Sequence, residues 1–406
     1  MLETARMVSE QPASAVSSFA PESGVGAEIA DAACSAYDAD VPAPTCQPAP
    51  FFSLVMPAYN AQDHIGGILQ AIVEQPFDSW ELIVVDDCST DDTRALVQHW
   101  ADADARIRLI SHETNQGPAA ARNTGMAEAR GTWLWMPDSD DSFDGDILVR
   151  AHALVTSGEY DVVLFGFTER YVGKRGEFLY DHPMPLPEID WSDPALWHPC
   201  IIDLEQSTHY GYPWNKMYRL QLLRSIGAQF ERVILIEDIL FNIEVFNHVR
   251  SAAVLDGLPY CYVKQENTSV TNSNAYSAAE YYAVHRRRIS VLRDQLSAWD
   301  VLDARAKGIL GSLYARYILS TLERNCYAVP EGFGHKGRVA WVRGTFEDPL
   351  FNELVPAAQA HDSKALSVCA AVLKGKRAGL AVALGRLIYL VHHASYGAYT
   401  KIRSGR

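Results

Sequence analysis

The chain has 406 residues and a formal net charge of −15, and 48% of its residues are hydrophobic. This length provides for one large α/β domain and a smaller second unit, and the apolar fraction is that of a protein with a buried core. The negative charge excludes a general nucleic-acid-binding protein, which needs a positive surface to neutralise phosphates.

The two ends of the chain differ in charge. Residues 1–50 contain seven carboxylates and one basic residue, Arg6, and are rich in Ala, Ser and Pro. We predict a disordered tail here, because this composition buries too little apolar surface to offset the entropy lost on ordering. Residues 1–20 lack the pattern of a secretory signal, and no apolar run is long enough to span a bilayer.

The seven cysteines are dispersed, without a CxxC pair or a Cys/His cluster at zinc spacing. This usage is typical of reduced thiols, so we expect a cytoplasmic protein.

From residue 51 onward, apolar runs alternate with segments of helical periodicity. The predicted strands are 51–56, 81–85, 107–110, 132–136 and 161–167, and the predicted helices are 65–73, 91–100 and 117–130. This alternation predicts an α/β domain over 51–270, in which helices cover both faces of a mixed, mostly parallel sheet. Residues 271–365 are expected to form a helical extension, and 366–406 a basic, apolar tail.

Polar residues follow three of the predicted strands. These segments are Pro57-Ala58-Tyr59-Asn60, Asp86-Asp87 and Asp138-Ser139-Asp140-Asp141. Ligands of open α/β sheets bind beyond the carboxyl ends of the strands. We therefore expect the functional residues at this edge.

The acidic segment 138–141 indicates a site for Mg²⁺ or Mn²⁺. Hard oxygen ligands at a strand end suit these ions, which keep positions open for substrate phosphates. A calcium loop starting at Asp140 is excluded, because its twelfth position is Ala151 instead of Glu. A solvated acidic turn that caps the next helix stays open as the alternative.

Three further residues are candidates for nucleotide recognition. Asp87 can accept a hydrogen bond from a base N–H, and Tyr59 can stack on a base. Arg122 can reach a phosphate or hold an acidic loop. The structural alternatives are a turn at Asp87, a core tyrosine and a surface arginine.

Glu237 and Asp238 follow an apolar run and precede a segment of helical periodicity. The unpaired N–H groups at a helix start stabilise a carboxylate as an anion, which favours Asp238 as a general base. Simple helix capping is the alternative. Trp214 is either a sugar platform or a buried side chain, and Lys216 either binds phosphate or pairs with Glu237.

Six segments in this order resemble family 2 of the GT-A glycosyltransferases, over residues 51 to about 271. They are Val55–Asn60, Val85–Asp91, Asn115–Asn123, Asp138–Asp141, Trp214–Tyr218 and Glu237–Phe241.

The resemblance implies a GT-A fold and an inverting, metal-dependent glycosyltransferase that uses a nucleotide-diphosphate sugar, with a UDP-sugar preferred. It implies Asp238 as the base and Mn²⁺ or Mg²⁺ at Asp140 and Asp138. The nucleotide pocket would contain Pro57, Tyr59, Asn60, Asp87, Arg122 and Asp138. The donor or acceptor sugar would meet Trp214, Asn215, Lys216 and Glu237.

The C-terminal tail predicts one of two arrangements. Lys374, Lys376 and Arg377 precede the apolar segment Leu380–Val391, and residues 364–406 carry eight basic residues and no carboxylate. Such a helix either lies on the anionic inner face of the cell membrane or packs on the catalytic domain. Membrane contact would suit a lipid-linked acceptor, and a saccharide without a lipid is the alternative acceptor.

The sequence bears on two competing functions. A sugar nucleotidyltransferase needs a Gly-rich, basic loop after the first strand, and residues 61–64 do not contain one. A catalytically inactive sugar-nucleotide-binding or scaffold protein of the same fold stays open, and it predicts that Asp238 is dispensable.

Overall fold

The computed structural model describes residues 49–173, 176–233, 235–265, 277–326, 334–359 and 364–394. The predicted disordered tail lies outside these residues except for its last two positions. The end of the basic tail, 395–406, also lies outside them.

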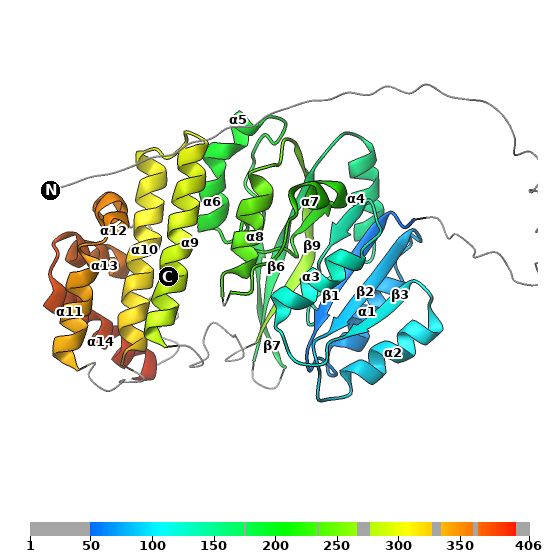
Figure 1. Ribbon diagram of the computed structural model, residues 1–406, viewed down its shortest axis with the longest axis horizontal. Helices are drawn as coiled ribbons and strands as arrows, with labels where there is room; N and C mark the ends of the chain where they lie inside the picture. The colour runs from blue at the N-terminus through cyan, green and yellow to red at the C-terminus, as the bar shows by residue number, and fades with distance from the viewer. Residues whose placement is uncertain are drawn as a thin grey trace, which may run out of the picture. The chain divides into compact units, whose positions relative to one another are not determined.

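Within the described residues, nine strands form one sheet in the order β3-β2-β1-β4-β8-β6-β9-β5, with β7 paired to β6 (Figure 1). The strands are β1 Phe52–Ala58, β2 Trp80–Asp86, β3 Ile107–Ser111, β4 Trp133–Trp135, β5 Ser142–Phe143, β6 Val162–Val172, β7 Phe178–Met184, β8 Lys216–Arg219 and β9 Ala252–Gln265.

Helices connect these strands and continue after the last one. Those of the sheet region are α1 Ile65–Val73, α2 Thr93–Ala103, α3 Pro118–Glu128, α4 Ile147–Thr156, α5 Pro194–Trp197, η1 His198–Cys200, α6 Ile201–Gln206, α7 Leu220–Ile226 and α8 Glu237–Phe246. Those that follow are α9 Ala278–Ala298, α10 Ala304–Arg324, α11 His335–Thr345, α12 Pro349–Leu354, η3 Val355–Ala357, α13 Lys364–Lys374 and α14 Ala378–Ala394.

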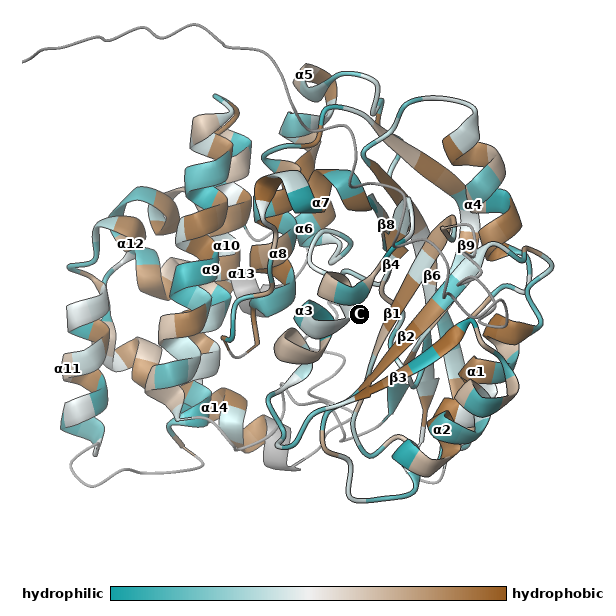
Figure 2. Ribbon diagram, turned by 45° about the vertical axis from the view of Figure 1, so that its right-hand side comes forward, coloured by the Kyte–Doolittle hydropathy of each residue, from teal (hydrophilic) through white to brown (hydrophobic). Residues whose placement is uncertain are grey.

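The sheet is buried on both faces, as the continuous apolar runs predict. Side chains alternate along a strand, so Val55 of β1 joins one core and its neighbours Leu54 and Met56 join the other. The first core includes buried residues of α3, α7 and α8, and the second includes those of α1 and α4. Figure 2 shows the apolar strands lying between α3 and the α1–α2 pair. The predicted α/β class is therefore confirmed.

The predicted predominance of parallel strands is wrong for the second half of the sheet. Of the eight strand pairings among the described residues, four are parallel and four are antiparallel. The antiparallel pairings all involve β5, β7 or β8. Sequence periodicity does not reveal this, because a strand buried on both faces is continuously apolar whichever way its neighbours run.

The helices after β9 pack around α10, which contacts α9, α12, α13 and α14. Ser277 and Glu280 form a capping box at the start of α9, and the Asp303 side chain caps α10. One face of α14 is buried against these helices, whereas Leu380, Leu387 and Leu390 are exposed. In the structure α14 packs on α10, α11 and α13 of the helical extension, with an apolar face left uncovered, and the membrane contact stays a prediction.

Gly131, which directly precedes β4, is packed against β1. A Cβ added to Gly131 would lie 2.6 Å from the Ser53 backbone nitrogen, whereas one added to Gly145 would meet no atom within 4 Å. We predict that Gly131→Ala lowers the free energy of unfolding by about 1–3 kcal/mol, since the backbone of β1 has to shift. Gly145→Ala is the control and should change it by less than about 1 kcal/mol. Thermal unfolding of both variants measures this, and equal melting temperatures would contradict the packing described.

Candidate active site

The acidic turn lies directly after β4 and divides its three carboxylates into two kinds. Asp141 is buried, whereas Asp138 is partly exposed and Asp140 is exposed. The Asp141 carboxylate accepts hydrogen bonds from the Tyr260 hydroxyl at 2.6 Å and from the Val263 N–H at 2.8 Å. Asp141 thus anchors the turn to β9 and leaves Asp138 and Asp140 facing outward.

The three carboxylates repel one another. Burial, together with the charges of Asp138 and Asp140, raises the pKa of Asp141 well above its ordinary value. Partial desolvation and the Asp138 charge also raise the pKa of Asp140. A cation at this turn would relieve the repulsion, and the outward carboxylate oxygens are of the type that Mg²⁺ and Mn²⁺ bind.

Arg122 of α3 connects this turn to α8. Its Nη2 lies 2.8 Å from Asp138 Oδ1, and its Nη1 lies 2.9 Å from Asp238 Oδ1. The Arg122 side chain is 5% exposed, and its guanidinium lies 5.4 Å from the Phe230 ring centroid. Burial opposes the positive charge, but the two carboxylates outweigh it and raise the pKa of Arg122. The predicted surface position of Arg122 is therefore excluded.

Asp238 and Glu237 occupy the first turn of α8. Burial raises the pKa of Asp238 to about 7, the neighbouring Glu237 and Asp138 charges act in the same direction, and Arg122 opposes them. Burial also raises the pKa of Glu237. A carboxyl group with a pKa near neutrality, close to a second acidic group, suits proton transfer.

Tyr59 and Asn60 lie after β1, on the β2 side of β4. The Tyr59 side chain is 51% exposed, so its ring is free to stack on a ligand, whereas Pro57 is partly buried within β1. Asn60 is in the left-handed region with φ 50°, and its Oδ1 accepts a hydrogen bond from the Thr90 N–H at 2.8 Å. Asn60 thus holds two strand-end loops together.

Asp87 connects the end of β2 to the start of α3. It is 3% exposed, and its oxygens accept hydrogen bonds from the N–H groups of Gln116 and Gly117. His112 Nδ1 lies 2.6 Å from Asp87 Oδ1. Gly117, with φ 87°, makes the turn that begins α3, so Asp87 contributes to the placement of Arg122. The base contact predicted for Asp87 stays a prediction.

Trp214, Asn215 and Lys216 are buried, so the prediction of an exposed sugar platform is wrong. Tyr212 and Tyr260 both stack on the Trp214 ring, at centroid distances of 4.6 and 4.7 Å. These residues precede and begin β8, which pairs between β4 and β6.

Lys216 neither faces a phosphate site nor pairs with Glu237. Its Nζ donates hydrogen bonds to the carbonyls of His209 and Tyr212 and to Asn215 Oδ1. Burial lowers the pKa of Lys216 well below its ordinary value. These three oxygens satisfy the hydrogen-bonding capacity of the buried Lys216 ammonium group.

Tyr260 and His112 were not anticipated from the sequence. Tyr260 holds the acidic turn and His112 contacts Asp87, but both residues are far from their partners in sequence. The only sequence signal is weak: Tyr260 and Tyr262 alternate on a strand, as residues that share one face do.

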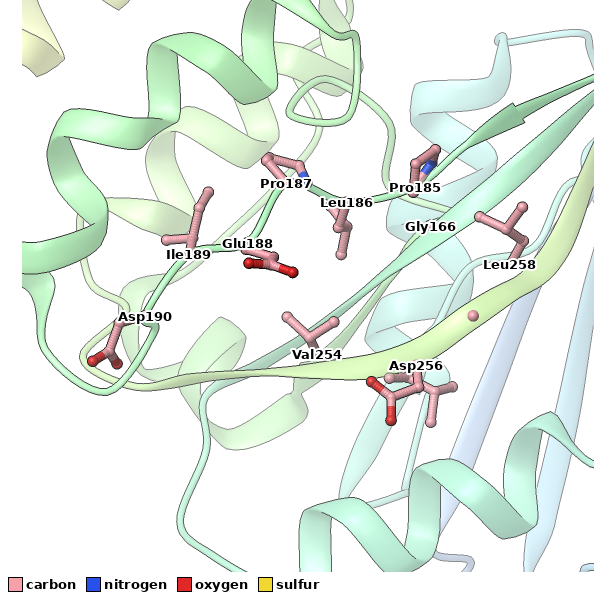
Figure 3. A pocket seen from close by; sticks show the side chains of 12 residues that line it. Gly166, Pro185, Leu186, Pro187, Glu188, Ile189, Asp190, Val254, Asp256 and Leu258 are labelled. Atoms are coloured by element: carbon pink, nitrogen blue, oxygen red, sulfur yellow. The ribbon is translucent and has the colours of Figure 1, made fainter.

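An open hollow of about 640 Å³ lies elsewhere, between β6, the first half of β9 and the segment after β7 (Figure 3). Glu188, Asp190 and Asp256 provide its acidic groups, and none of the predicted site residues lines it. Within the described ranges, no three His, Cys, Asp or Glu side chains form a metal site by themselves. Every helix of the described residues is too short or too polar to cross a bilayer.

Comparison with known proteins relates part of this chain to one family. Residues 53–227 match the sequence model of glycosyl transferase family 2. EpsJ of Bacillus subtilis, an uncharacterized glycosyltransferase, is 28% identical over 54% of this chain and 62% of its own length. The poly(ribitol-phosphate) beta-N-acetylglucosaminyltransferase TarS of Staphylococcus aureus is 28% identical over 58% of this chain and 39% of its own.

The crystal structure of TarS residues 1–349 in complex with UDP-GlcNAc shares this fold. It superposes with a TM-score of 0.54 at 22% identity, over 85% of this chain and 92% of that one. The present chain thus spans less than two thirds of either full-length relative, EpsJ or TarS.

The Arg122 bridge predicts a pH-dependent stability. In Arg122→Met, Asp138 and Asp238 lose their cation, so we expect the free energy of unfolding to fall by about 2–4 kcal/mol at neutral pH. The loss should shrink toward about pH 5, because Asp238 of the folded variant then binds a proton more readily than Asp238 of the unfolded chain. Arg94→Met, on the exposed face of α2, is the control. Urea unfolding at both pH values measures the difference, and a pH-independent loss would refute the bridge.

Proposed function

We propose that this chain is an inverting, metal-dependent glycosyltransferase that uses a nucleotide-diphosphate sugar, since residues 53–227 match the model of glycosyl transferase family 2. The observation that carries the proposal is the placement of Asp138 and Asp238 on one guanidinium, at 2.8 and 2.9 Å. Asp138 is proposed to face the diphosphate, and Asp238 is proposed to activate the acceptor. Both therefore contact the side chain of Arg122.

Asp238 is the proposed general base. It takes the proton of an acceptor hydroxyl while that oxygen attacks the anomeric carbon from the face opposite the diphosphate. The bond from the anomeric carbon to the diphosphate oxygen breaks, and its electron pair leaves with the nucleoside diphosphate. One displacement inverts the anomeric configuration. The raised pKa of Asp238 supports this role, because a base with a pKa near 7 accepts a proton readily at neutral pH.

Asp138 and Asp140 would hold Mn²⁺ or Mg²⁺. When bound, the ion supplies positive charge against the leaving diphosphate. Two outward carboxylates fit an ion that takes its other ligands from phosphate and water. Arg122 keeps Asp138 in position and keeps Asp238 ionised over a wider pH range.

The nucleotide is proposed to lie on the β1–β2 side of the acidic turn. Tyr59 provides an exposed ring for the base, while Pro57, Asn60 and Asp87 shape the two loops beside it. A UDP-sugar is the preferred donor. The relative TarS is described as an N-acetylglucosaminyltransferase, and its structure contains UDP-GlcNAc; we transfer only the nucleotide-sugar class to this chain.

The acceptor is proposed to be a saccharide or a lipid-linked saccharide of the cell envelope, reached from the cytoplasmic side. The exposed leucines of α14 and the basic residues Lys374, Lys376 and Arg377 support a peripheral contact with an anionic membrane.

The base assignment is tested by Asp238→Asn, which keeps the shape of the side chain but cannot accept the proton. We expect the turnover of the donor, including slow hydrolysis, to fall about 10²–10⁴-fold. For the native enzyme, kcat/KM should rise with pH through about 7 and level off above it, because the ionised form of Asp238 is active. Glu244→Gln, on the same helix, is the control. Unchanged turnover in Asp238→Asn would favour the inactive binding or scaffold protein.

The donor and metal assignments are tested by thermal shift with UDP-, GDP- and dTDP-sugars, with and without Mn²⁺. A ligand that binds only the folded state raises the melting temperature, so a UDP-sugar with Mn²⁺ should give the largest increase. Asp140→Asn should remove the part of this increase that depends on Mn²⁺, whereas Asp146→Asn, in the exposed loop before α4, should not. If no nucleotide sugar raises the melting temperature of the native chain, the proposed function is wrong.

A further inference from the structure

Several tyrosines of β6, β7 and β9 lie on one face of the sheet. Tyr171 of β6 pairs with Tyr180 of β7 on one side and with Lys264 of β9 on the other. Tyr262 precedes Lys264 by two residues, so its side chain is on the same face. The Tyr171 and Tyr180 rings stack, with centroids 4.5 Å apart and planes inclined by 16°.

The row continues inward to the acidic turn. Tyr260 lies two residues before Tyr262 on β9, and its hydroxyl donates to Asp141 and accepts from the Asp138 N–H. The strand therefore leads, in steps of two residues, from the proposed metal turn outward to the tyrosines at the edge of the sheet.

Tyr212 links the same row to the proposed base. Its ring centroid lies 5.6 Å from that of Tyr262. Burial raises the pKa of the Tyr212 hydroxyl, and the carboxylates of Glu169 and Asp238 act in the same direction. The segment that carries Tyr212 lies against the start of α8, because the Asn242 side-chain amide donates hydrogen bonds to the carbonyls of both Gly211 and Asp238. The rings of Tyr212 and Tyr262 are partly exposed.

The rings are held by a buried carboxylate. Glu169 is 5% exposed, and it contacts Lys264, accepts a hydrogen bond from the Tyr171 hydroxyl at 3.0 Å and lies 3.3 Å from His182 Nδ1. Lys264 Nζ in turn lies 5.5 Å from the Tyr171 ring centroid and 5.3 Å from that of Tyr262. Nothing in this network requires Tyr180 to be exposed, yet its side chain is 52% exposed at the outer end.

Rigid, partly exposed tyrosines suit one kind of ligand. A tyrosine gives a flat apolar face and a polar edge at a low cost in side-chain entropy. A saccharide is complementary to this surface, because its ring has an apolar C–H face and a rim of hydroxyl groups. The flat nucleobase of the donor would instead stack on Tyr59, an exposed ring on the other side of β4 in the strand order.

We propose that Tyr180, Tyr171, Tyr262 and Tyr212, called here the tyrosine strip, bind the saccharide acceptor and guide its hydroxyl toward Asp238. This assignment rests on the proposed glycosyl transfer, and it identifies the surface that binds the saccharide acceptor. The sugar farthest from the reacting hydroxyl lies on Tyr180, and the sugar that reacts lies beside Tyr212.

The chain contains a matched control for the test. Phe178 is on the same strand as Tyr180 and is 61% exposed. The β6–β7 register shifts between Tyr171 and Val172, so Phe178 pairs with Val172 and lies on the opposite face, 5.7 Å from the Arg170 guanidinium. Both Tyr180→Ala and Phe178→Ala remove one exposed ring from β7. Only Tyr180→Ala shortens the tyrosine strip. Damage to the β6–β7 hairpin would affect both variants, whereas loss of stacking on the saccharide would affect only Tyr180→Ala.

The probes are disaccharides to tetrasaccharides of glucose, galactose, mannose and N-acetylglucosamine, titrated into the full chain by saturation-transfer NMR with UDP and Mn²⁺ present. We expect at least one to bind, Tyr180→Ala to weaken it roughly three- to tenfold, and Tyr180→Trp and Phe178→Ala to keep native affinity. No binding to the native chain, no effect of Tyr180→Ala, or equal losses in both alanine variants would overturn the tyrosine strip.

The donor is measured separately on the same variants by thermal shift with nucleotide sugars. A native chain that binds a nucleotide sugar, but whose saccharide binding is indifferent to Tyr180, overturns only the tyrosine strip. A native chain that binds no nucleotide sugar overturns the proposed glycosyl transfer, whatever the saccharides do.

Discussion

The buried guanidinium of Arg122 is the interaction on which this site depends. It lies between Asp138, at the end of a strand, and Asp238, at the start of a helix 100 residues later in the sequence. Without it, Asp138, Asp238 and the neighbouring Glu237 would repel one another at low exposure to solvent. With it, both carboxylates are held at fixed positions, Asp138 in the acidic turn and Asp238 in the first turn of α8.

Two other buried carboxylates set where this guanidinium can lie. Asp87 binds the backbone at the start of α3, and that helix carries Arg122. Asp141 binds Tyr260 and the Val263 backbone, and these contacts fix the turn that carries Asp138. In both contacts, a buried carboxylate fixes the orientation of a neighbouring segment of the backbone. They leave the exposed Asp140, together with the Asp138 oxygen that does not contact Arg122, as the proposed ligands of a cation.

The strand order separates the two substrates proposed for this site. β1 and β2 lie on one side of β4 and bring Tyr59 and Asp87 to the edge; β6, β7 and β9 lie on the other and bring the tyrosine strip. The acidic turn after β4 lies between them. A sheet that was parallel throughout would have ended there in further βα loops, whereas the antiparallel β6–β7 hairpin extends the surface past the turn.

What the sequence determined by itself is local. Apolar runs and helical periodicity located the first strands and helices. The rule that ligands bind at strand ends selected Tyr59, Asp87 and Asp138, and the position at a helix start selected Asp238. Tertiary structure decided what periodicity leaves open. Trp214 and Lys216 are as compatible with an exposed site as with a core until β8 is seen to insert between β4 and β6. The Arg122 bridge, the Asp141 anchor and the tyrosine strip all join residues distant in the chain, and such contacts depend on strand pairing and register, which no local pattern of residues encodes.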